Sequence, residues 1–373
     1  MTTIRVQRAA GIVTLVPQGA STVLDDAPAL DVLVLEVRGG HLSWNLLAGH
    51  SLPAAVLDDP ESAQDWLWAV YGEDAALTVA DTTLADADTG RQHTLPAVPA
   101  RPELANALRR LAYAHWAARW WPASTVDGIP ALDPDLLAAE ITELTGACDT
   151  AVDGADAEPF TRPGESPSRT PDPGTARDDN RMMSESFGRA DDYALAAGGS
   201  TPAGGGLILA RGSGEWDWRR CPPGILDAGE NAVSWQVART AEISTVQVSV
   251  VAAPDCRRLV PEHLRPYARV RSTQVATAGR DQAGPSPSAG VEFTMPLHLR
   301  GDTWTGSVQI PGPPETFPEP AVFVPGVGPA DPAPDESAVR AQIRRFARLR
   351  LTEHTGDTLL AAEAAAAETD GDF

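Results

Sequence analysis

One serine in the chain stands in a context in which it could act as a nucleophile. Ser51 lies in the string Gly49-His50-Ser51-Leu52-Pro53, directly after the apolar run at residues 44–48. A serine hydroxyl attacks a carbonyl carbon when a neighbouring base accepts its proton, so the chemistry would be acyl transfer or hydrolysis. The sequence does not select that base, because several histidines follow the serine and none has a diagnostic context: His93, His115, His263 and His298.

The string around Ser51 resembles the nucleophile elbow of α/β-hydrolases, a G-x-S-x-G turn between a strand and a helix. It departs from that pattern at Pro53, where the family has a glycine that allows strand and helix to pack closely. It also comes early, with little chain before it to build the central strands. The competing interpretation is an ordinary serine in a turn, so a serine hydrolase that uses Ser51 is the alternative function.

Several other chemistries lack the residues that they need. Lysine is absent and all 29 basic residues are arginine, which excludes a P-loop, a protein kinase and a pyridoxal-phosphate Schiff base. No CxxC or HExxH string predicts zinc, and the acidic doublets do not alternate as calcium ligands do. His115 falls on the apolar side of an expected helix and is predicted to be a core histidine. The sequence therefore predicts no cofactor and no metal.

A second candidate site is suited to binding rather than to catalysis. Trp216, Trp218, Arg219 and Arg220 stand close together before a proline turn. Tryptophan and arginine are enriched at binding hot spots because both combine a large contact area with directed polar atoms. The competing interpretation is that the two tryptophans fill the core of a β domain.

An arginine stripe near the C-terminus is the third candidate. Arg340, Arg344 and Arg348 recur at helical spacing, opposite an apolar stripe of Val339, Ile343, Phe346 and Leu349. These arginines would either pair with the protein's own carboxylates or bind an acidic partner.

Composition narrows the class of partner. The chain has 373 residues, a formal net charge of −22 and a pI near 4.6. This charge argues against nucleic acid or an anionic membrane, both of which require a basic surface. An odd number of cysteines, no apolar run long enough to span a membrane and no signal-peptide pattern indicate a cytoplasmic protein.

The spacing of apolar and turn residues predicts an α+β multidomain protein. We expect a small α+β domain at 1–98, with a strand at Ala76–Val79, and a Trp-rich helical hairpin at 99–148. An acidic, proline-rich, mostly disordered linker at 149–203 follows, because it has few large apolar residues to bury. Residues 204–330 are predicted to form an antiparallel, immunoglobulin-like β-sandwich, and residues 331–373 the arginine-striped helix and an acidic tail. The expected strands of the sandwich are Leu207–Ala210, Val233–Ala238, Thr245–Val251, Ala268–Ser272, Val291–Leu299 and Thr303–Ile310.

The strings RRLAYAHWAARWWPAS and EWDWRRCPPG resemble segments of an actinobacterial protein family for which no catalytic residues are known. The chain is also similar to accessory subunits of MoxR-type ATPases and von Willebrand A-domain proteins in bacterial conflict systems. These resemblances imply a non-enzymatic interaction or assembly subunit that binds a protein partner. A carbohydrate- or peptide-binding sandwich stays open, since exposed tryptophans serve both ligands.

Overall fold

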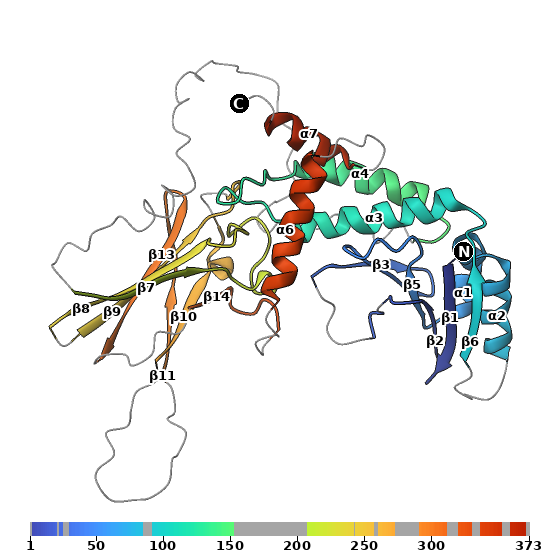
Figure 1. Cartoon of the computed structure of the whole chain (residues 1–373), viewed down its shortest axis with the longest axis horizontal. Coiled ribbons are helices and arrows are strands. Elements are labelled where there is room, and N and C mark those ends of the chain that lie inside the picture. The colour runs from blue at the N-terminus through green and yellow to red at the C-terminus, as the bar shows by residue number, and fades with distance from the viewer. Residues whose placement is uncertain are drawn as a thin grey trace, which may run out of the picture. The chain divides into compact units, whose positions relative to one another are not determined.

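In the computed structural model the chain divides into two compact units (Figure 1). Unit 1 comprises Met1–Trp121, Leu132–Phe160 and Ala338–Phe373, and unit 2 comprises Pro122–Ala131 and Thr161–Ser337. The structure describes residues 2–20, 22–24, 30–84, 92–152, 207–241, 243–256, 260–272, 291–311, 320–329, 336–352 and 359–370. Nearly all of the expected linker at 149–203 therefore lies outside the described residues.

Unit 1 contains a six-stranded antiparallel sheet in the order β3-β4-β5-β2-β1-β6. The alternating apolar residues of these strands face the core, as in β3, where Leu33, Leu35 and Val37 are buried. The strands are β1 (Thr2–Ala9), β2 (Ile12–Pro17), β3 (Val32–Val37), β4 (Gly40–Asn45), β5 (Ala54–Leu57) and β6 (Gln92–Ala97).

The turn between β3 and β4 requires glycine at two positions. Gly39 and Gly40 both have positive φ angles, +80° and +157°. A Cβ at Gly39 would lie 2.1 Å from the carbonyl oxygen of Asp59, and one at Gly40 would lie 2.0 Å from that of Val56. The missing side chains thus allow this hairpin to contact β5 and the residues that cap the first helix.

The helices of unit 1 begin where capping residues and prolines stand. Asp59 and Asp133 accept backbone hydrogen bonds at the N-termini of α1 and α4, each followed directly by a proline. In α3, the indole of Trp116 donates a 2.7 Å hydrogen bond to the carbonyl oxygen of Leu30. The helices are α1 (Pro60–Tyr71), α2 (Glu73–Leu84), α3 (Pro102–Trp120), α4 (Pro134–Ala147), α6 (Ser337–Thr352) and α7 (Ala361–Asp370).

Unit 2 contains a five-stranded antiparallel sheet, in the order β12-β13-β9-β8-β7, and a three-stranded one, in the order β11-β10-β14. The chain passes directly from one sheet to the other at the buried Leu297. A Cβ at Gly306 in β13 would lie 2.7 Å from the side chain of Leu297 and from the carbonyl oxygen of Pro296, so this glycine allows the sheets to approach. The strands are β7 (Leu207–Gly214), β8 (Val233–Thr240), β9 (Ile243–Val251), β10 (Tyr267–Ser272), β11 (Val291–Pro296), β12 (His298–Arg300), β13 (Thr303–Pro311) and β14 (Ala321–Phe323).

The mixture of helices and antiparallel sheets confirms the α+β class. Two local predictions are wrong. Ala76–Val79 belongs to α2 rather than to a strand, because its apolar residues continue a helical pattern that begins at Glu73. The run Val291–Leu299 is two strands in different sheets rather than one. Unit 1 also joins segments that the sequence analysis treats as three separate regions, namely 1–98, most of 99–148 and the C-terminal helices.

Candidate functional site

The tryptophans of the predicted binding string lie in the interior of unit 2. Trp216 and Trp218 are only 6% and 4% exposed. The indole nitrogen of Trp216 donates a 2.7 Å hydrogen bond to the carbonyl oxygen of Asp227. Both rings are therefore used in core packing and do not form a surface patch.

The two arginines that follow contact residues of the same unit. Arg219 forms ion pairs with Asp217 and Glu336, at 3.2 and 3.3 Å. The guanidinium of Arg220 lies over the ring of Phe323, and that of Arg269 lies over the same ring. The contact between Arg220 and Phe323 holds η2 (Trp218–Arg220) against β14.

The side chain of Asp227 is the centre of a polar cluster that the sequence analysis did not single out. It is buried and accepts hydrogen bonds from the Ser124 hydroxyl (2.6 Å), the Thr125 amide (2.7 Å) and hydroxyl (3.0 Å), and the Gly229 amide (2.8 Å). Burial raises the pKa of this carboxyl above its ordinary value, although the four hydrogen bonds act in the opposite direction. Ser124 Oγ in turn accepts a bond from the Asp127 amide. The cluster holds the loop at residues 122–131 within unit 2.

The arginines of α6 do not form the single exposed stripe that their spacing predicts. Arg340 and Arg344 are buried, at 7% and 3% exposure, whereas Arg345 and Arg348 are exposed. Leu349, expected on the apolar side, is 45% exposed. The predicted division of this helix is therefore wrong. Both arginines have interactions within the protein, as a buried guanidinium requires.

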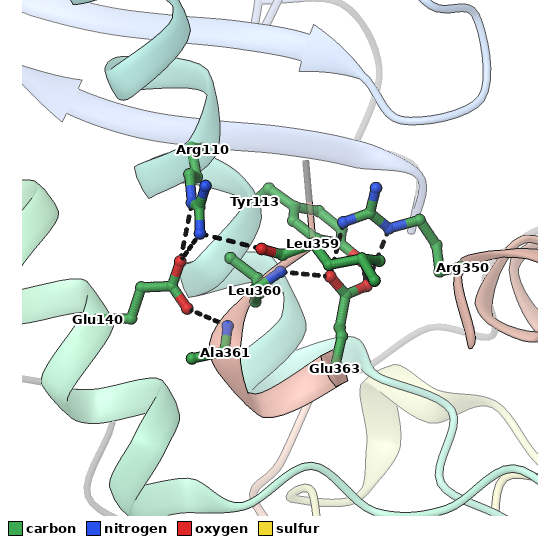
Figure 2. A network of polar contacts seen from close by, with 8 residues as sticks. All are labelled: Arg110, Tyr113, Glu140, Arg350, Leu359, Leu360, Ala361 and Glu363. Carbon is green, nitrogen blue, oxygen red and sulfur yellow. Dashed lines mark hydrogen bonds and ion pairs between the residues drawn. The ribbon is translucent and has the colours of Figure 1, made fainter. Parts of the chain in front are cut away.

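A network of two buried glutamates and two half-buried arginines surrounds the first turn of α7, and we call it the α7 network (Figure 2). Glu363, with no exposed surface, accepts hydrogen bonds from the Tyr113 hydroxyl (2.6 Å), from Nε and Nη2 of Arg350 (2.9 and 2.6 Å) and from the Leu360 amide (2.8 Å). The bond from Leu360 is half of a capping box, in which the third helical residue accepts from the residue before the helix. The guanidinium of Arg350 also lies 5.2 Å from the centre of the Tyr113 ring.

A second carboxylate completes the α7 network. Glu140 of α4 accepts from Nε of Arg110 (2.8 Å) and, through its other oxygen, from the amide of Ala361 (2.7 Å). Arg110 also donates to the carbonyl oxygen of Leu359, at 2.9 Å. Figure 2 shows the two glutamates on either side of the residues that begin α7. Carboxylates at a helix N-terminus are stabilised by the unpaired amides there.

The α7 network contains the residue types of an acid–base site. The pKa values of Tyr113 and Arg350 are shifted so that these two groups keep their protons rather than exchange them. Burial, followed by the negative charge of Glu363, raises the pKa of Tyr113 well above its ordinary value. The hydroxyl therefore remains a hydrogen-bond donor. Burial alone would lower the pKa of Arg350, but the hydrogen bond to Glu363 and the charges nearby raise it overall. With two arginines opposite two glutamates, the network is suited to holding α7 in place. Two features of the sequence could have indicated this network: Glu140 interrupts the apolar stripe of α4, and Glu363 is the third residue of α7.

The serine of the alternative function does not lie in a nucleophile elbow. Ser51 is exposed in a bend between β4 and β5, which pair with each other as antiparallel strands. An elbow requires a helix after the serine, and the element that follows is a strand. His115, at the half-buried edge of α3, has a pKa lowered by burial.

The cysteines are unsuited to nucleophilic chemistry. No disulfide joins Cys148, Cys221 and Cys256. Burial raises the pKa of all three thiols, that of Cys148 to about 12, so the reactive thiolate is disfavoured. Within the part of the chain that the structure describes, no three His, Cys, Asp or Glu side chains are grouped so that they could hold a metal ion. Across those same ranges, no helix is both long and apolar enough to cross a membrane.

Comparison of the chain with known protein families, with curated proteins and with solved structures finds no match.

Proposed function

We propose that the chain is a non-enzymatic interaction or assembly subunit that binds another protein through the outward face of α6. That face consists of Arg345, Arg348 and Leu349, all exposed. The observation that carries the proposal is the 45% exposure of Leu349 beside these two arginines. A large apolar side chain beside guanidinium groups combines contact area with directed hydrogen bonds, as hot spots do.

The opposite side of α6 supports the proposal because it holds the helix in place. The ring of Phe346 packs edge-on against Tyr113, with the ring centres 6.1 Å apart. Arg350 is joined to the buried Glu363 of the α7 network. A face presented on an anchored helix loses little conformational entropy when a partner binds.

The charges indicate the partner's chemistry. Two exposed arginines in a chain of net charge −22 favour a partner that presents carboxylates next to an apolar patch. The resemblance to accessory subunits leads us to propose an ATPase-based conflict system, in the cytoplasm, as the setting. We also propose that α3 and α4 form a helical hairpin and that unit 2 is an immunoglobulin-like sandwich, on the support of its two antiparallel sheets.

The test is affinity capture with the tagged full-length chain and partner identification by mass spectrometry, at low and at high salt. The variant combines Arg345→Glu, Arg348→Glu and Leu349→Ala. Its control combines Arg5→Glu and Arg265→Glu, which change the net charge equally at exposed arginines elsewhere. Wild type and control should retain one stoichiometric partner that high salt weakens, and the variant should lose it. A partner that the variant retains would exclude this face, and no partner for wild type would exclude the proposed function.

A further inference from the structure

The two faces of the five-stranded sheet in unit 2 differ in chemistry. Val246, Val248 and Val250 of β9 are at most 3% exposed and, with Trp304 of β13, face the core. Because side chains alternate along a strand, the intervening residues face the other way. We call these the outer face: the alternate positions from 234 to 240 on β8, from 243 to 249 on β9 and from 305 to 309 on β13.

The two edge strands place exposed arginines on this side of the sheet, Arg211 of β7, which pairs with Gln236, and Arg300 of β12, which pairs with Thr303. Between them, every residue of the outer face on β8, β9 and β13 is uncharged. Two adjacent rows of the register illustrate this: Gln236, Gln247 and Ser307 in one, and Ala238, Thr245 and Gln309 in the next. Ser307 and Gln309 are exposed, and Gln247 and Thr245 are half-buried by their neighbours. The other face of unit 2 is different, since Arg269 and Arg271 on β10 form ion pairs with Glu292 on β11.

Apolar residues extend the uncharged surface at one end. Ile243, the first residue of β9, is 48% exposed, and Ile208 of β7 is 51% exposed. Their pairings with Thr240 and with Ala238 place both side chains on the outer-face side of the sheet. Depletion of charged residues at the centre of a surface is one part of the compositional signal of a protein interface.

We propose that the outer face binds the same face of a second copy of this chain and forms a two-fold symmetric dimer. Two copies that each carry a charge of −22 repel one another, and a face without carboxylates is where they can approach most closely. Glutamine amides both donate and accept, so such a face is complementary to itself. Gln236 already donates a 2.9 Å hydrogen bond to Gln247, which fixes the orientation of both amides.

The size of the face agrees with this occupant. The outer face on β8, β9 and β13 continues onto the edge strand β7, which carries Arg211, and these four strands have eight or nine residues each. At about 4.8 Å between strands and about 3.4 Å per residue, they cover roughly 500 Å². Two copies would bury about 1,000 Å², the lower limit for a specific interface. The dimer is therefore expected to be reversible and to depend on concentration.

Sedimentation velocity of the full-length chain, over a wide range of concentrations and at two salt concentrations, tests the proposal. Wild type should form a dimer that salt strengthens, because salt screens the repulsion between the copies. The variant Gln247→Glu with Thr245→Asp places two carboxylates on each copy at the centre of the interface, and its dissociation constant should rise by at least about tenfold. The control, Gln92→Glu with Thr94→Asp, makes the same changes at exposed positions of β6 and should dimerise like wild type.

Three results would overturn the proposal: a monomeric wild type at every concentration and salt, a variant that dimerises as wild type does, or a control that is equally weakened. A urea unfolding curve for each variant separates loss of the dimer from loss of the fold. The variant of the α6 face should leave the dimer intact, so failure of the proposed function and failure of this inference give different results.

Discussion

The hydroxyl of Tyr113 in α3 donates a 2.6 Å hydrogen bond to the carboxylate of Glu363 in α7, across 250 positions of sequence. Both groups are buried, and Arg350 neutralises the carboxylate from the end of α6. One glutamate thus joins three helices of unit 1. Its removal would leave a half-buried guanidinium and a buried hydroxyl without their acceptor, which costs more than the hydrogen bonds contribute.

Glu363→Gln should lower the free energy of unfolding of unit 1 by about 3 kcal/mol, because it leaves the buried part of Arg350 without its countercharge. Tyr113→Phe should cost about 1.5–3 kcal/mol, since it removes one hydrogen bond to a charged group. The double variant should cost less than the sum of the two, because both changes affect the same contact. Urea unfolding followed by circular dichroism measures all three.

Glu103→Gln is the matched control for Glu363→Gln. Glu103 pairs with Arg101 at 3.1 Å, but both side chains are largely exposed. Water screens this pair, and the carboxylate lies in the first turn of α3, so the change should lower the free energy of unfolding by no more than about 1 kcal/mol. Equal effects of the two glutamine substitutions would show that the α7 network contributes nothing beyond a surface ion pair.

Two glycine-to-alanine substitutions should change the free energy of unfolding in opposite directions. Gly306→Ala places a methyl group 2.7 Å from Leu297 and from a carbonyl oxygen, so it should destabilise unit 2 by about 1–3 kcal/mol. Gly146→Ala in α4 meets nothing within 4 Å, and alanine is the better helix former, so it should stabilise unit 1 by about 0.5–1 kcal/mol. Thermal unfolding of the two variants measures both shifts. Equal shifts of the same sign would contradict the close approach of the two sheets.

Local patterns located many of the helices and strands but not the contacts that organise them. The capping aspartate before Pro134 and the proline at Pro102 stand where α4 and α3 begin, and those signals span a few residues. The strand predicted at Ala76–Val79 is wrong, because a short apolar run is compatible with a helix as well as with a strand. The α7 network could not be predicted, because Arg110 and Tyr113 meet partners 30 and 250 positions away.

Residue type alone also misplaced the candidate binding residues. Trp216 and Trp218 are residues of the type found at binding hot spots, but both are buried in the core. Tryptophan is used both in binding surfaces and in core packing, so residue type does not distinguish the two. On α6, arginines at helical spacing suggested an exposed stripe, yet two of them are buried and Leu349 is exposed. Which side of a helix is buried depends on the elements that pack against it, and the sequence of the helix does not identify those elements.

A fluorophosphonate probe should not label Ser51. The serine lies in an exposed bend between two antiparallel strands, a geometry that does not present it to a base or to an oxyanion hole. The measurement is mass spectrometry of the probe-treated chain, with Ser51→Ala as the reference. Labelling of wild type that the substitution abolishes would restore the hydrolase alternative.

The stability of unit 2 should depend on pH through Asp227. Because burial raises the pKa of this carboxyl in the folded state above its ordinary value of 3.8, the folded state binds its proton more readily than the unfolded state does. The contribution of this group to the free energy of unfolding is therefore fully present below pH 3.8 and is lost as the pH rises through the raised value. Asp227→Asn removes the titration, but its amide turns a donor toward the donors of Ser124, Thr125 and Gly229.

At neutral pH we expect Asp227→Asn to be less stable than wild type by about 1–3 kcal/mol, because buried donors lose their acceptor. As the pH falls toward 3.8, the free energy of unfolding of wild type should rise relative to that of the variant. The difference between the two should increase by at most about 1.4 kcal/mol per pH unit. Only the difference between the two curves is informative, since other carboxyl groups titrate in both proteins. Urea unfolding of both at a series of pH values, followed by tryptophan fluorescence, gives that difference. A gap that narrows as the pH falls would mean that the carboxylate is favoured by its hydrogen bonds more than it is disfavoured by burial.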